Sequence, residues 1–437
     1  MSGFLAIVGR PNVGKSTLYN RLVEARDAIV DDQSGVTRDR HYGQADWSGF
    51  EFTVIDTGGY VETTDDLFEK EIKKQVHIAL EEADVIIFMC DVRTGITDQD
   101  DAFVKVLRGV KKPVLVAANK SDNSDLIYQT AEFYAFGFDE VFPISSVSGS
   151  GTGELLDRAV EMLRKNERKT EVLEEGLPKF CVLGKPNVGK STFINALLGE
   201  ERNIVADIPG TTRDSIHTLY NKFDKKFYLI DTAGIRKKSS VSENIEFYSV
   251  MRAIRALEYS DVAFVVIDAT EGITAQDLNL ISLAMRRKKG LVILINKWDK
   301  LEKETNTMRD YERLLREKMA PFTDVPIIFT SALEKTRIFQ ALEEGLQVYE
   351  NLGRRISTSE LNDWLQETMK RHPVPSYGGR HVKIKYMTQL PPKTPVFAFF
   401  CNMPNFVVDS YRRYLENEMR KTFKFSGVPV KFAFKKK

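Results

Sequence analysis

The stretch GRPNVGKST at Gly9–Thr17 decides the fold, because it recurs as GKPNVGKST at Gly184–Thr192, 175 residues further along the chain. Four more motifs repeat at an offset of 175 or 177: GVTRD at 35–39 with GTTRD at 210–214, DTGG at 56–59 with DTAG at 231–234, GITDQD at 95–100 with GITAQD at 272–277, and NKSD at 119–122 with NKWD at 296–299. Two copies of one unit of about 165 residues therefore stand in tandem.

Each copy alternates apolar, strand-like runs with amphipathic stretches. FLAIV precedes the first glycine loop and FCVL the second; after the loops, Leu18 and Leu22, or Phe193 and Leu197, recur at helical spacing. Later runs such as VIIFMCD and VAFVVID end in an acidic residue and are typical of buried parallel strands. The alternation predicts α/β domains with doubly wound, mostly parallel sheets and ligands at the carboxyl ends of the strands.

The repeat stops near Leu352, and a different segment follows. We expect a first copy of the repeated α/β domain at 1–165, a charged linker at 166–177, a second copy at 178–350 and a small α+β domain at 351–437. In that last domain the pattern predicts a helix at 359–370, strands at 382–388 and 395–401, a helix at 409–422 and a strand at 428–434.

Charge is distributed unevenly along the chain. The 437 residues carry a net charge of +1, but residues 351–437 hold 17 basic and 6 acidic side chains, a net of +11, which leaves −10 for the first 350. A basic piece on an acidic body predicts nucleic acid or an acidic surface as partner. Docking of the basic piece on the acidic body of the same chain explains the asymmetry as well.

Composition narrows the class of protein. With 42% hydrophobic and 29% charged residues the chain is an ordinary globular protein, and its apolar runs are too short to cross a membrane. The first residues lack a signal-peptide pattern. The three cysteines, Cys90, Cys181 and Cys401, form no CxxC motif, which argues against disulfide or zinc frameworks. We expect a cytoplasmic protein without membrane contacts, and a monomer by default.

The repeated loop has the GxxxxGKS pattern between a strand and a helix, which is typical of a phosphate-binding loop. Its glycines let backbone N–H groups converge on phosphate oxygens, and the following helix adds its positive end. Lys15 and Lys190 would reach the β- and γ-phosphates, and Ser16 and Ser191 would ligate Mg²⁺.

The partner motifs decide which nucleotide binds. In DxxG, Asp56 and Asp231 can hold Mg²⁺ while the final glycine senses the γ-phosphate. In NKxD, Asp122 and Asp299 can each accept hydrogens from N1–H and the 2-amino group of guanine. Adenine has no such amino group and would leave a carboxylate unpaired, so the motif predicts guanine nucleotides.

Two threonines lie between the loop and DxxG, where a switch threonine would contact Mg²⁺ and the γ-phosphate. These are Thr37 and Thr212, although neighbouring glycines make a simple turn residue an alternative. The serines of SSV at 145–147 and SAL at 331–333 are candidates for closing over the base.

The candidate residues follow from these motifs. We assign GTP binding to Gly9, Arg10, Pro11, Asn12, Val13, Gly14, Lys15, Ser16, Asp56, Thr57, Gly58, Gly59, Asn119, Lys120, Ser121, Asp122, Ser145, Gly184, Lys185, Pro186, Asn187, Val188, Gly189, Lys190, Ser191, Asp231, Thr232, Ala233, Gly234, Asn296, Lys297, Trp298, Asp299 and Ser331. Catalysis is assigned to Lys15, Thr37, Lys190 and Thr212, and Mg²⁺ to Ser16, Thr37, Asp56, Ser191, Thr212 and Asp231.

With these motifs in place, the whole chain resembles the Der (EngA) family of bacterial GTPases, within the translational TRAFAC class. The resemblance implies GTP hydrolysis coupled to maturation of the large (50S) ribosomal subunit, with rRNA as partner. It also implies a KH-like C-terminal domain whose ribosome association is gated by nucleotide state.

The residue after DxxG is Tyr60 in one copy and Ile235 in the other, so neither supplies a water-orienting glutamine amide. Related GTPases with a hydrophobic residue here use K⁺ held partly by a loop asparagine, and Asn12 and Asn187 occupy that place. This resemblance implies K⁺-stimulated hydrolysis, in which the ion stabilises developing negative charge. The alternative is that asparagine simply suits the loop.

The basic domain lacks the GXXG loop of a standard KH domain, since its only glycines are Gly353, Gly378, Gly379 and Gly427. Its basic residues could meet rRNA phosphates without reading sequence, and a solvated helix face explains them nearly as well. These residues are Arg412, Arg413, Arg420, Lys421 and Lys435 to Lys437. Phe397, Phe399 and Phe400 are more typical of core than of a base-stacking platform.

Two other functions remain open on the sequence. A GTPase of tRNA modification or iron handling would share these loops but predicts an extra modification or membrane domain, which the pattern does not show. A nucleotide-gated scaffold with one catalytically idle domain fits as well, because both copies keep the lysine, serine, threonine and aspartate.

Overall fold

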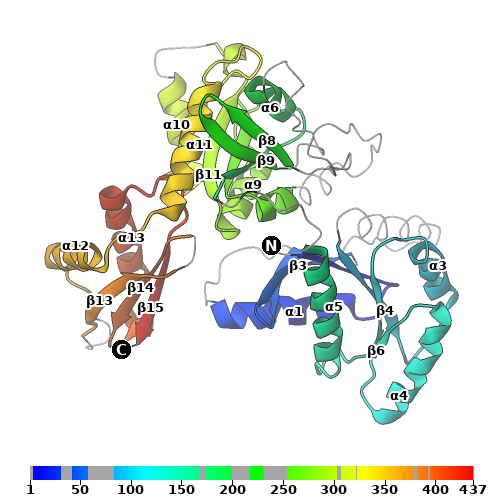
Figure 1. Ribbon diagram of the computed structural model, residues 1–437. Coiled ribbons are helices and arrows are strands. Elements are labelled where there is room, and N and C mark those ends of the chain that lie inside the picture. Colours follow the sequence, from blue (N-terminus) through cyan, green and yellow to red (C-terminus); the bar gives the residue numbers. More distant parts are fainter. Residues whose placement is uncertain are drawn as a thin grey trace. The chain divides into compact units, whose positions relative to one another are not determined.

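The computed structural model describes residues 3–30, 42–57, 83–167, 174, 176–198, 217–230, 253–302, 307–320, 322–376, 381–391 and 394–436. The chain divides into two compact units, Met1–Leu173 and Glu174–Lys437 (Figure 1). The motif residues 35–39, 58–59, 210–214 and 231–234, which include Thr37 and Thr212, lie outside the described residues.

The first unit is a six-stranded sheet in the order β2-β3-β1-β4-β5-β6. Only β2 runs antiparallel to its neighbour among these strands. Its elements are β1 (Gly3–Val8), α1 (Lys15–Val30), β2 (Tyr42–Trp47), β3 (Phe50–Asp56), β4 (Val85–Asp91), α3 (Asp98–Leu107), β5 (Val114–Asn119), α4 (Ser124–Gln129), η3 (Thr130–Phe136), β6 (Val141–Pro143) and α5 (Thr152–Glu167). The chain reverses direction across the sheet beside β1, so the loop after β1 lies at a topological switch point, where such sheets bind ligands.

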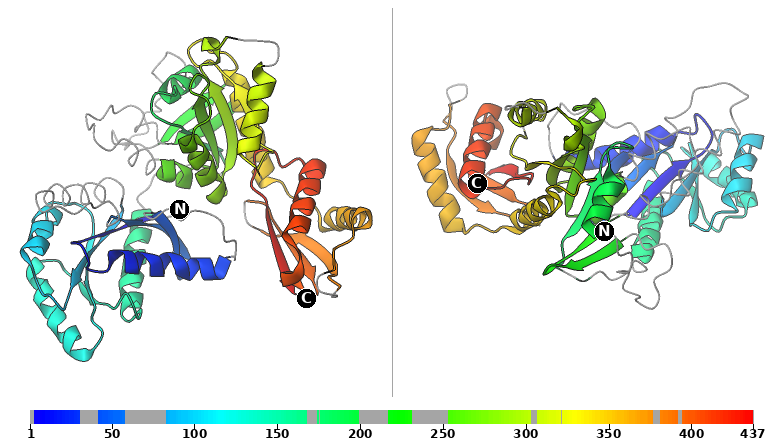
Figure 2. Two further views of the ribbon diagram at one scale, coloured as in Figure 1. Left: turned by 180° about the vertical axis from the view of Figure 1, so that it is seen from behind. Right: turned by 90° about the horizontal axis from the view of Figure 1, so that it is seen from above.

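Strand β4 shows why both faces of this sheet are covered. Ile87 and Met89 pack into the cluster that includes Leu18 and Leu22 of α1 and Leu155 of α5. Figure 2 shows the ribbon of this unit from two further sides. Because side chains alternate along a strand, Phe88 faces the other way. Its ring lies 5.8 Å from that of Phe103 on α3 and 5.6 Å from that of Phe136. Burial on both faces explains the continuous apolar run.

The second unit begins with a sheet of the same design, in the order β12-β11-β10-β7-β9-β8 with β8 antiparallel to β9. Its elements are β7 (Lys179–Leu183), α6 (Lys190–Leu198), β8 (His217–Lys222), β9 (Lys225–Ile230), β10 (Val262–Asp268), α9 (Ala275–Arg286), β11 (Gly290–Asn296), η4 (Trp298–Lys300), α10 (Thr307–Lys318), β12 (Ile327–Phe329) and α11 (Ile338–Gly353). The predicted fold class, two tandem phosphate-loop α/β domains followed by a small α+β domain, is confirmed.

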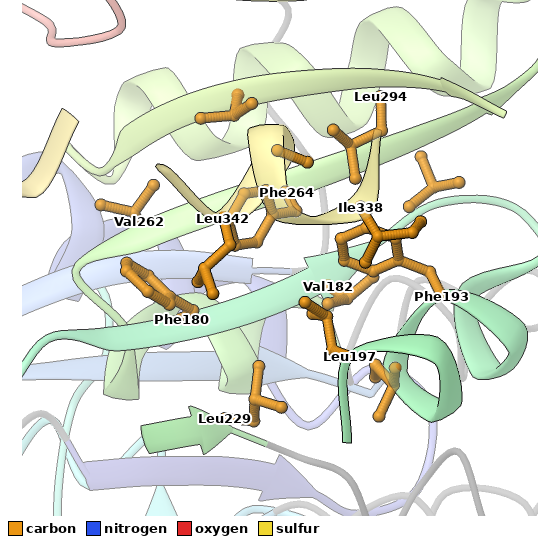
Figure 3. Close-up of a cluster of buried hydrophobic side chains, with 14 of the residues drawn as sticks. Phe180, Val182, Phe193, Leu197, Leu229, Val262, Phe264, Leu294, Ile338 and Leu342 are labelled. Atoms are coloured by element: carbon orange, nitrogen blue, oxygen red, sulfur yellow. The ribbon is translucent and has the colours of Figure 1, made fainter. Parts of the chain in front are cut away.

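The core of this second sheet is built around Phe264 on β10 (Figure 3). Its ring lies 5.4 Å from that of Phe180 and 5.9 Å from that of Phe193. Helix α11 crosses this ring at Gly345, where an added Cβ would come within 2.4 Å of the ring. The glycine therefore sets how closely the helix approaches the sheet.

The last part of the unit is a three-stranded sheet, β13-β14-β15, whose first pair is antiparallel and second pair parallel. Its elements are α12 (Thr358–Arg371), β13 (Ile384–Gln389), β14 (Val396–Cys401), η5 (Pro404–Phe406), α13 (Asp409–Phe423) and β15 (Lys431–Lys436). Phe397 and Phe399 are fully buried in its core, as predicted. Phe400 alternates to the other face and stacks on Tyr386, with ring centroids 4.5 Å apart.

Several boundaries differ from those expected by one to three residues, and two of them are instructive. Helix α5 runs to Glu167, into the stretch predicted as linker; Arg164 and Lys165 in its last turn favour continuation, since basic side chains stabilise a helix C-terminus. The final strand starts at Lys431 and not at Val428, because Val428 is buried in the core of the second GTPase sheet.

Val428 belongs to a junction between the small domain and the second GTPase sheet. The Gly427 carbonyl accepts from the N–H of Leu291 on β11 at 2.7 Å, and the Gly427 N–H donates to the Asp324 carbonyl at 2.9 Å. Arg420 forms an ion pair with Asp324 at 3.5 Å and is only 10% exposed. The small domain is thus hydrogen-bonded to the sheet that precedes it.

Among the described residues, no helix combines the length and apolar character that crossing a bilayer requires.

The close approach at Gly345 predicts a stability effect. Replacing Gly345 by alanine places a methyl group against Phe264 and should lower the free energy of unfolding of the second unit by about 1–3 kcal/mol through overpacking. Gly353→Ala is the matched control, because nothing lies within 4 Å of its added Cβ. Urea unfolding followed by circular dichroism measures both; equal midpoints for the two variants would contradict the packing account.

Candidate functional site

The two phosphate loops have the same local geometry. Each follows the central strand of its sheet and leads into a helix that begins at the motif lysine, Lys15 in α1 and Lys190 in α6. Lys15 Nζ donates to the carbonyls of Gly9 and Arg10, both at 2.7 Å. Lys190 Nζ donates to the carbonyls of Gly184 and Lys185 at 2.8 and 2.5 Å. Each ammonium therefore lies across its own loop, where a phosphate group would find it.

Burial affects the charge of this lysine. Lys15 is 6% exposed, and burial lowers the pKa of Lys190 to about 8. A buried ammonium with main-chain carbonyls as acceptors is stabilised by an anion, since an opposite charge favours the ionised form. Both loops are accordingly suited to a polyanionic ligand.

The asparagine of NKxD links two loops of the candidate site through its side-chain amide. Asn119 is buried at the end of β5; its Nδ2 donates to the carbonyl of Val13 at 2.7 Å, and its Oδ1 accepts from the N–H of Ser146 at 2.8 Å. In the second unit, Asn296 does the same for Val188 and Ala332, at 2.8 and 2.9 Å. One amide thus joins the phosphate loop to the candidate base loop.

The last glycine of each loop makes room for this amide. Gly14 has φ +101°, a backbone conformation that side chains disfavour, and an added Cβ would lie 2.3 Å from Nδ2 of Asn119. Gly189 repeats both features against Asn296, with φ +99° and 2.3 Å. The glycines of the motif therefore serve the asparagine as well as the phosphate.

The lysine of NKxD turns back over the phosphate loop. Lys120 has φ 68°, and its Nζ binds Asp91 Oδ2 at 2.5 Å and the carbonyl of Asn12 at 3.2 Å. Lys297 binds Asp268 in the same way at 2.5 Å. Asp91 and Asp268 were not among the residues predicted for the site; the signal that would have found them is an aspartate that ends a buried strand in both copies, 177 residues apart.

The surroundings of the two aspartates predicted to recognise guanine differ between the copies. Asp122 lies at the surface and pairs with Arg93 Nη2 at 2.6 Å; the Ser145 hydroxyl and Arg93 hold the pKa of this carboxyl below its usual range. In the second unit the residue at the Arg93 position is Thr270, which hydrogen-bonds Asp268 instead. Asp299 lies on η4.

The candidate base loops are also held differently. Arg21 on α1 donates through Nε to the carbonyl of Ser146 at 2.8 Å, whereas the corresponding residue of the second unit is Ala196. There, Ser331 forms a β-bridge with Thr336. The structure thus places Ser145 and Ser331 in comparable loops that are fixed by different contacts.

Two predicted ligand positions have buried side chains. Ser121 donates to the carbonyl of Ala118 at 2.9 Å, and Trp298 is 8% exposed with its ring 4.4 Å from that of Phe329. Both side chains are buried against the protein, so these two residues can offer only main-chain atoms to a nucleotide.

Two residues predicted to ligate Mg²⁺ lie on neighbouring elements of the first unit. Asp56 ends β3 and is the register partner of Ile7 on β1, two residues before the phosphate loop, and Ser16 is the second residue of α1. Thr57 Oγ1 donates to the carbonyl of Ile7 at 2.6 Å and fixes the start of DxxG. Among the described residues, no group of three or more His, Cys, Asp and Glu could hold a metal. Few protein ligands plus substrate phosphates are what Mg²⁺ usually takes, so the residues fit this ion.

The loop asparagines proposed for K⁺ have a backbone reason of their own. Asn12 and Asn187 both have φ 64°, in the left-handed region that asparagine tolerates better than most residues. This conformation accounts for asparagine at both positions without an ion.

Together, fold and site define a phosphate-loop GTPase with two GTPase domains in tandem. Comparisons with known proteins agree: the family model of a 50S ribosome-binding GTPase matches residues 4–120 and 179–297, and that of the KH-domain-like, C-terminal part of EngA bacterial GTPase enzymes matches 355–435. The chain is 55% identical to GTPase Der of Christiangramia forsetii and 54% identical to GTPase Der of Flavobacterium psychrophilum, with 100% of each chain covered. The chain belongs to the Der family of GTPases and is a GTP-hydrolysing enzyme.

The guanine assignment predicts a change of base specificity. In Asp122→Asn the amide keeps one acceptor for N1–H and gains a donor that suits the 2-oxo group of xanthine. We expect the first unit to lose GDP affinity by about a hundredfold or more and to bind xanthosine diphosphate, while the second unit still binds GDP. Titration calorimetry should give two GDP sites in the wild type and one in the variant. Asp125→Asn, an exposed aspartate of α4, is the control; two unchanged GDP sites in Asp122→Asn would refute the assignment.

Proposed function

We propose that this enzyme is an assembly factor for the large (50S) ribosomal subunit, and that the nucleotide state of its GTPase domains gates binding to rRNA. The family description as ribosome-binding GTPases supports the proposal. The observation that carries it on this chain is the exposed basic surface of the C-terminal domain. We call the exposed lysines of and next to the two edge strands β13 and β15 the basic face; they are Lys383, Lys385, Lys435 and Lys436, while Arg413 and Lys421 are exposed on the outer side of α13.

Two arginines predicted for RNA contact have other partners. Arg420 binds Glu416 and Asp324 and donates to the carbonyl of Val428 at 3.0 Å, which commits it to the junction with the second GTPase sheet. Arg412 donates to the carbonyl of Val407 and lies 5.0 Å from the ring centroid of Phe434. The basic face is therefore smaller than the sequence predicted, and Arg420 is excluded from it.

The chemistry of each GTPase domain follows from its own residues. In each domain the carbonyls of the phosphate loop hold the loop lysine, Lys15 or Lys190, in place. From that position the lysine would bind the β- and γ-phosphates. Ser16 and Asp56, with Thr37, would hold Mg²⁺ in the first domain, and Ser191, Asp231 and Thr212 would do so in the second. Mg²⁺ would supply charge stabilisation at the β- and γ-phosphate oxygens. The predicted boundaries, GTPase domains at 1–165 and 178–350 with a linker at 166–177 and a KH-like domain at 351–437, belong to this proposal.

Co-sedimentation with large ribosomal subunits and their precursors tests the proposal. The protein is loaded with a non-hydrolysable GTP analogue, with GDP or with nothing, beside Lys15→Ala and Lys190→Ala. We expect pelleting that requires the GTP-like state and is lost in both variants. Pelleting that ignores the nucleotide would reduce the C-terminal domain to a simple RNA anchor, and no pelleting would overturn the ribosomal role.

The basic face predicts a charge-dependent contact. Lys435→Ala combined with Lys436→Ala should weaken pelleting by about tenfold at 150 mM salt and reduce its salt dependence, because fewer counterions are released. Lys105→Ala with Lys111→Ala makes the same charge change on exposed lysines of the first unit. Equal losses in both pairs would show a nonspecific effect of net charge and contradict a specific basic face.

K⁺ stimulation is a separate part of the proposal. We expect faster GTP hydrolysis in KCl than in NaCl, and loss of this difference in Asn12→Gly and Asn187→Gly. Glycine keeps the left-handed backbone at both positions while removing the carboxamide, so the substitution separates the ion from the conformation. Equal rates in the two salts for the wild type would remove K⁺ from the mechanism.

A scaffold with one idle domain remains the second candidate. This candidate rests on a difference between the two units. Asp122 pairs with Arg93, whereas in the second unit, which has Asp299 in place of Asp122, the residue equivalent to Arg93 is Thr270. Single-turnover hydrolysis in Lys15→Ala and Lys190→Ala reports each domain by itself.

A further inference from the structure

The repeated motif GITDQD, matched by GITAQD, has so far no role in the site. In both units it begins the helix after the fourth described strand of the sheet with a capping box, Thr97 with Asp100 at α3 and Thr274 with Asp277 at α9. Both aspartates are fully buried. An exposed capping carboxylate would do for the helix alone, so complete burial of the charge needs a further reason.

That reason is the second residue of each phosphate loop. Arg10 Nε donates to Asp100 Oδ2 at 3.2 Å, and Lys185 Nζ lies 3.7 Å from Asp277 Oδ2. The two basic side chains are 12% and 11% exposed. A basic residue of the loop and the capping aspartate of a distant helix thus form a buried ion pair in both units.

A second contact differs between the units in step with the basic residue. Arg10 also donates through Nη2 to the hydroxyl of Thr94. At the position of Thr94 the second unit has Glu271, whose Oε2 accepts from Lys185 Nζ at 2.7 Å. The planar guanidinium bridges a carboxylate and a hydroxyl, whereas the single ammonium is held between two carboxylates. The two units reach the same anchor by different pairs of residues.

The buried aspartate depends on this cation. Among the described residues, Oδ1 of Asp100 and of Asp277 has no hydrogen-bond partner. Burial raises the pKa of Asp100, while the Thr97 hydrogen bond and the charge of Arg10 oppose the rise. Removing the cation would leave a buried carboxylate with too few partners, which is costly.

The anchored basic residue also contacts the loop lysine, through its main chain. The residue whose side chain is anchored also supplies a main-chain carbonyl to it: Arg10 to Lys15 at 2.7 Å, and Lys185 to Lys190 at 2.5 Å. A displaced Arg10 would therefore displace an acceptor of the Lys15 ammonium. We propose that Arg10 and Lys185 are positioning residues that, pinned by Asp100 and Asp277, hold the phosphate loop in the shape that presents its lysine to the nucleotide phosphates.

This inference rests on the loops being the GTP sites, and it is independent of any ribosomal role. The first unit is tested in full-length Lys190→Ala, where only one phosphate loop keeps its lysine. A double-mutant cycle uses Arg10→Gln, Asp100→Asn and both together, with Asp101→Asn, an exposed aspartate of the same helix turn, as control. GDP affinity, kcat and KM are measured, and circular dichroism melting reports folding.

Each single variant should lower kcat/KM for GTP by about ten- to a hundredfold, because a small displacement of a positioned group has a large effect on rate. The double variant should lose no more than the worse single variant, since both act through one contact. Asp101→Asn should match the parent. Full additivity, or melting shifts with unchanged kinetics, would overturn the proposal.

The second unit supplies a rescue experiment for the first. Arg10→Lys alone should lose activity, because one ammonium cannot bridge Asp100 and Thr94 as the guanidinium does. Adding Thr94→Glu transplants the pairing of Lys185 with Glu271 and should restore kcat/KM to within about threefold of the parent. A double variant that melts like the parent but is no more active than Arg10→Lys alone would contradict the shared design.

Discussion

The site in each unit depends on one buried amide. Asn119 joins the carbonyl of Val13 in the phosphate loop to the N–H of Ser146 in the base loop, and Asn296 makes the equivalent pair of bonds. The two ends of a nucleotide are recognised by loops from different strands, so their separation has to be fixed by the protein. A side-chain amide, with one donor and one acceptor in fixed geometry, does this with a single residue. The glycine conformation at Gly14 follows from the space this amide needs.

The phosphate ends of the two units are alike, whereas their base ends have diverged. Each loop lysine rests on the same two carbonyls of its own loop, and each NKxD lysine binds the aspartate at the end of the neighbouring strand. At the base end, Arg21 and Arg93 of the first unit are replaced by Ala196 and Thr270. Phosphate recognition is thus kept by main-chain geometry, while the surroundings of the base differ in charge. A difference in nucleotide affinity between the units would have its physical origin there.

Much of this could be read from the sequence because the decisive signals are local and occur twice. The loop glycines, the apolar strands and the helical spacing of Leu18 and Leu22 each act within a few residues, and the repeat confirms them. Arg10 and Asp100, by contrast, are 90 residues apart in the sequence, and neither segment alone indicates that they form an ion pair. For the same reason Arg420 was predicted to face RNA: a basic residue on a helix looks exposed until its partner, Asp324, is known.

Strand β11 has a part in two distant places. Its carboxyl end is Asn296, which links the phosphate loop and the candidate base loop of the second unit, and near its start the N–H of Leu291 donates to the Gly427 carbonyl of the C-terminal domain. The seven residues of β11 span roughly 20 Å at about 3.3 Å per residue. The strand is hydrogen-bonded to neighbours on both sides and is therefore stiff. Nucleotide site and C-terminal domain therefore share one mechanical frame. Turning that domain against the second sheet would break the hydrogen bonds that Gly427 makes with Leu291 and Asp324, so these bonds oppose its movement relative to the candidate nucleotide site.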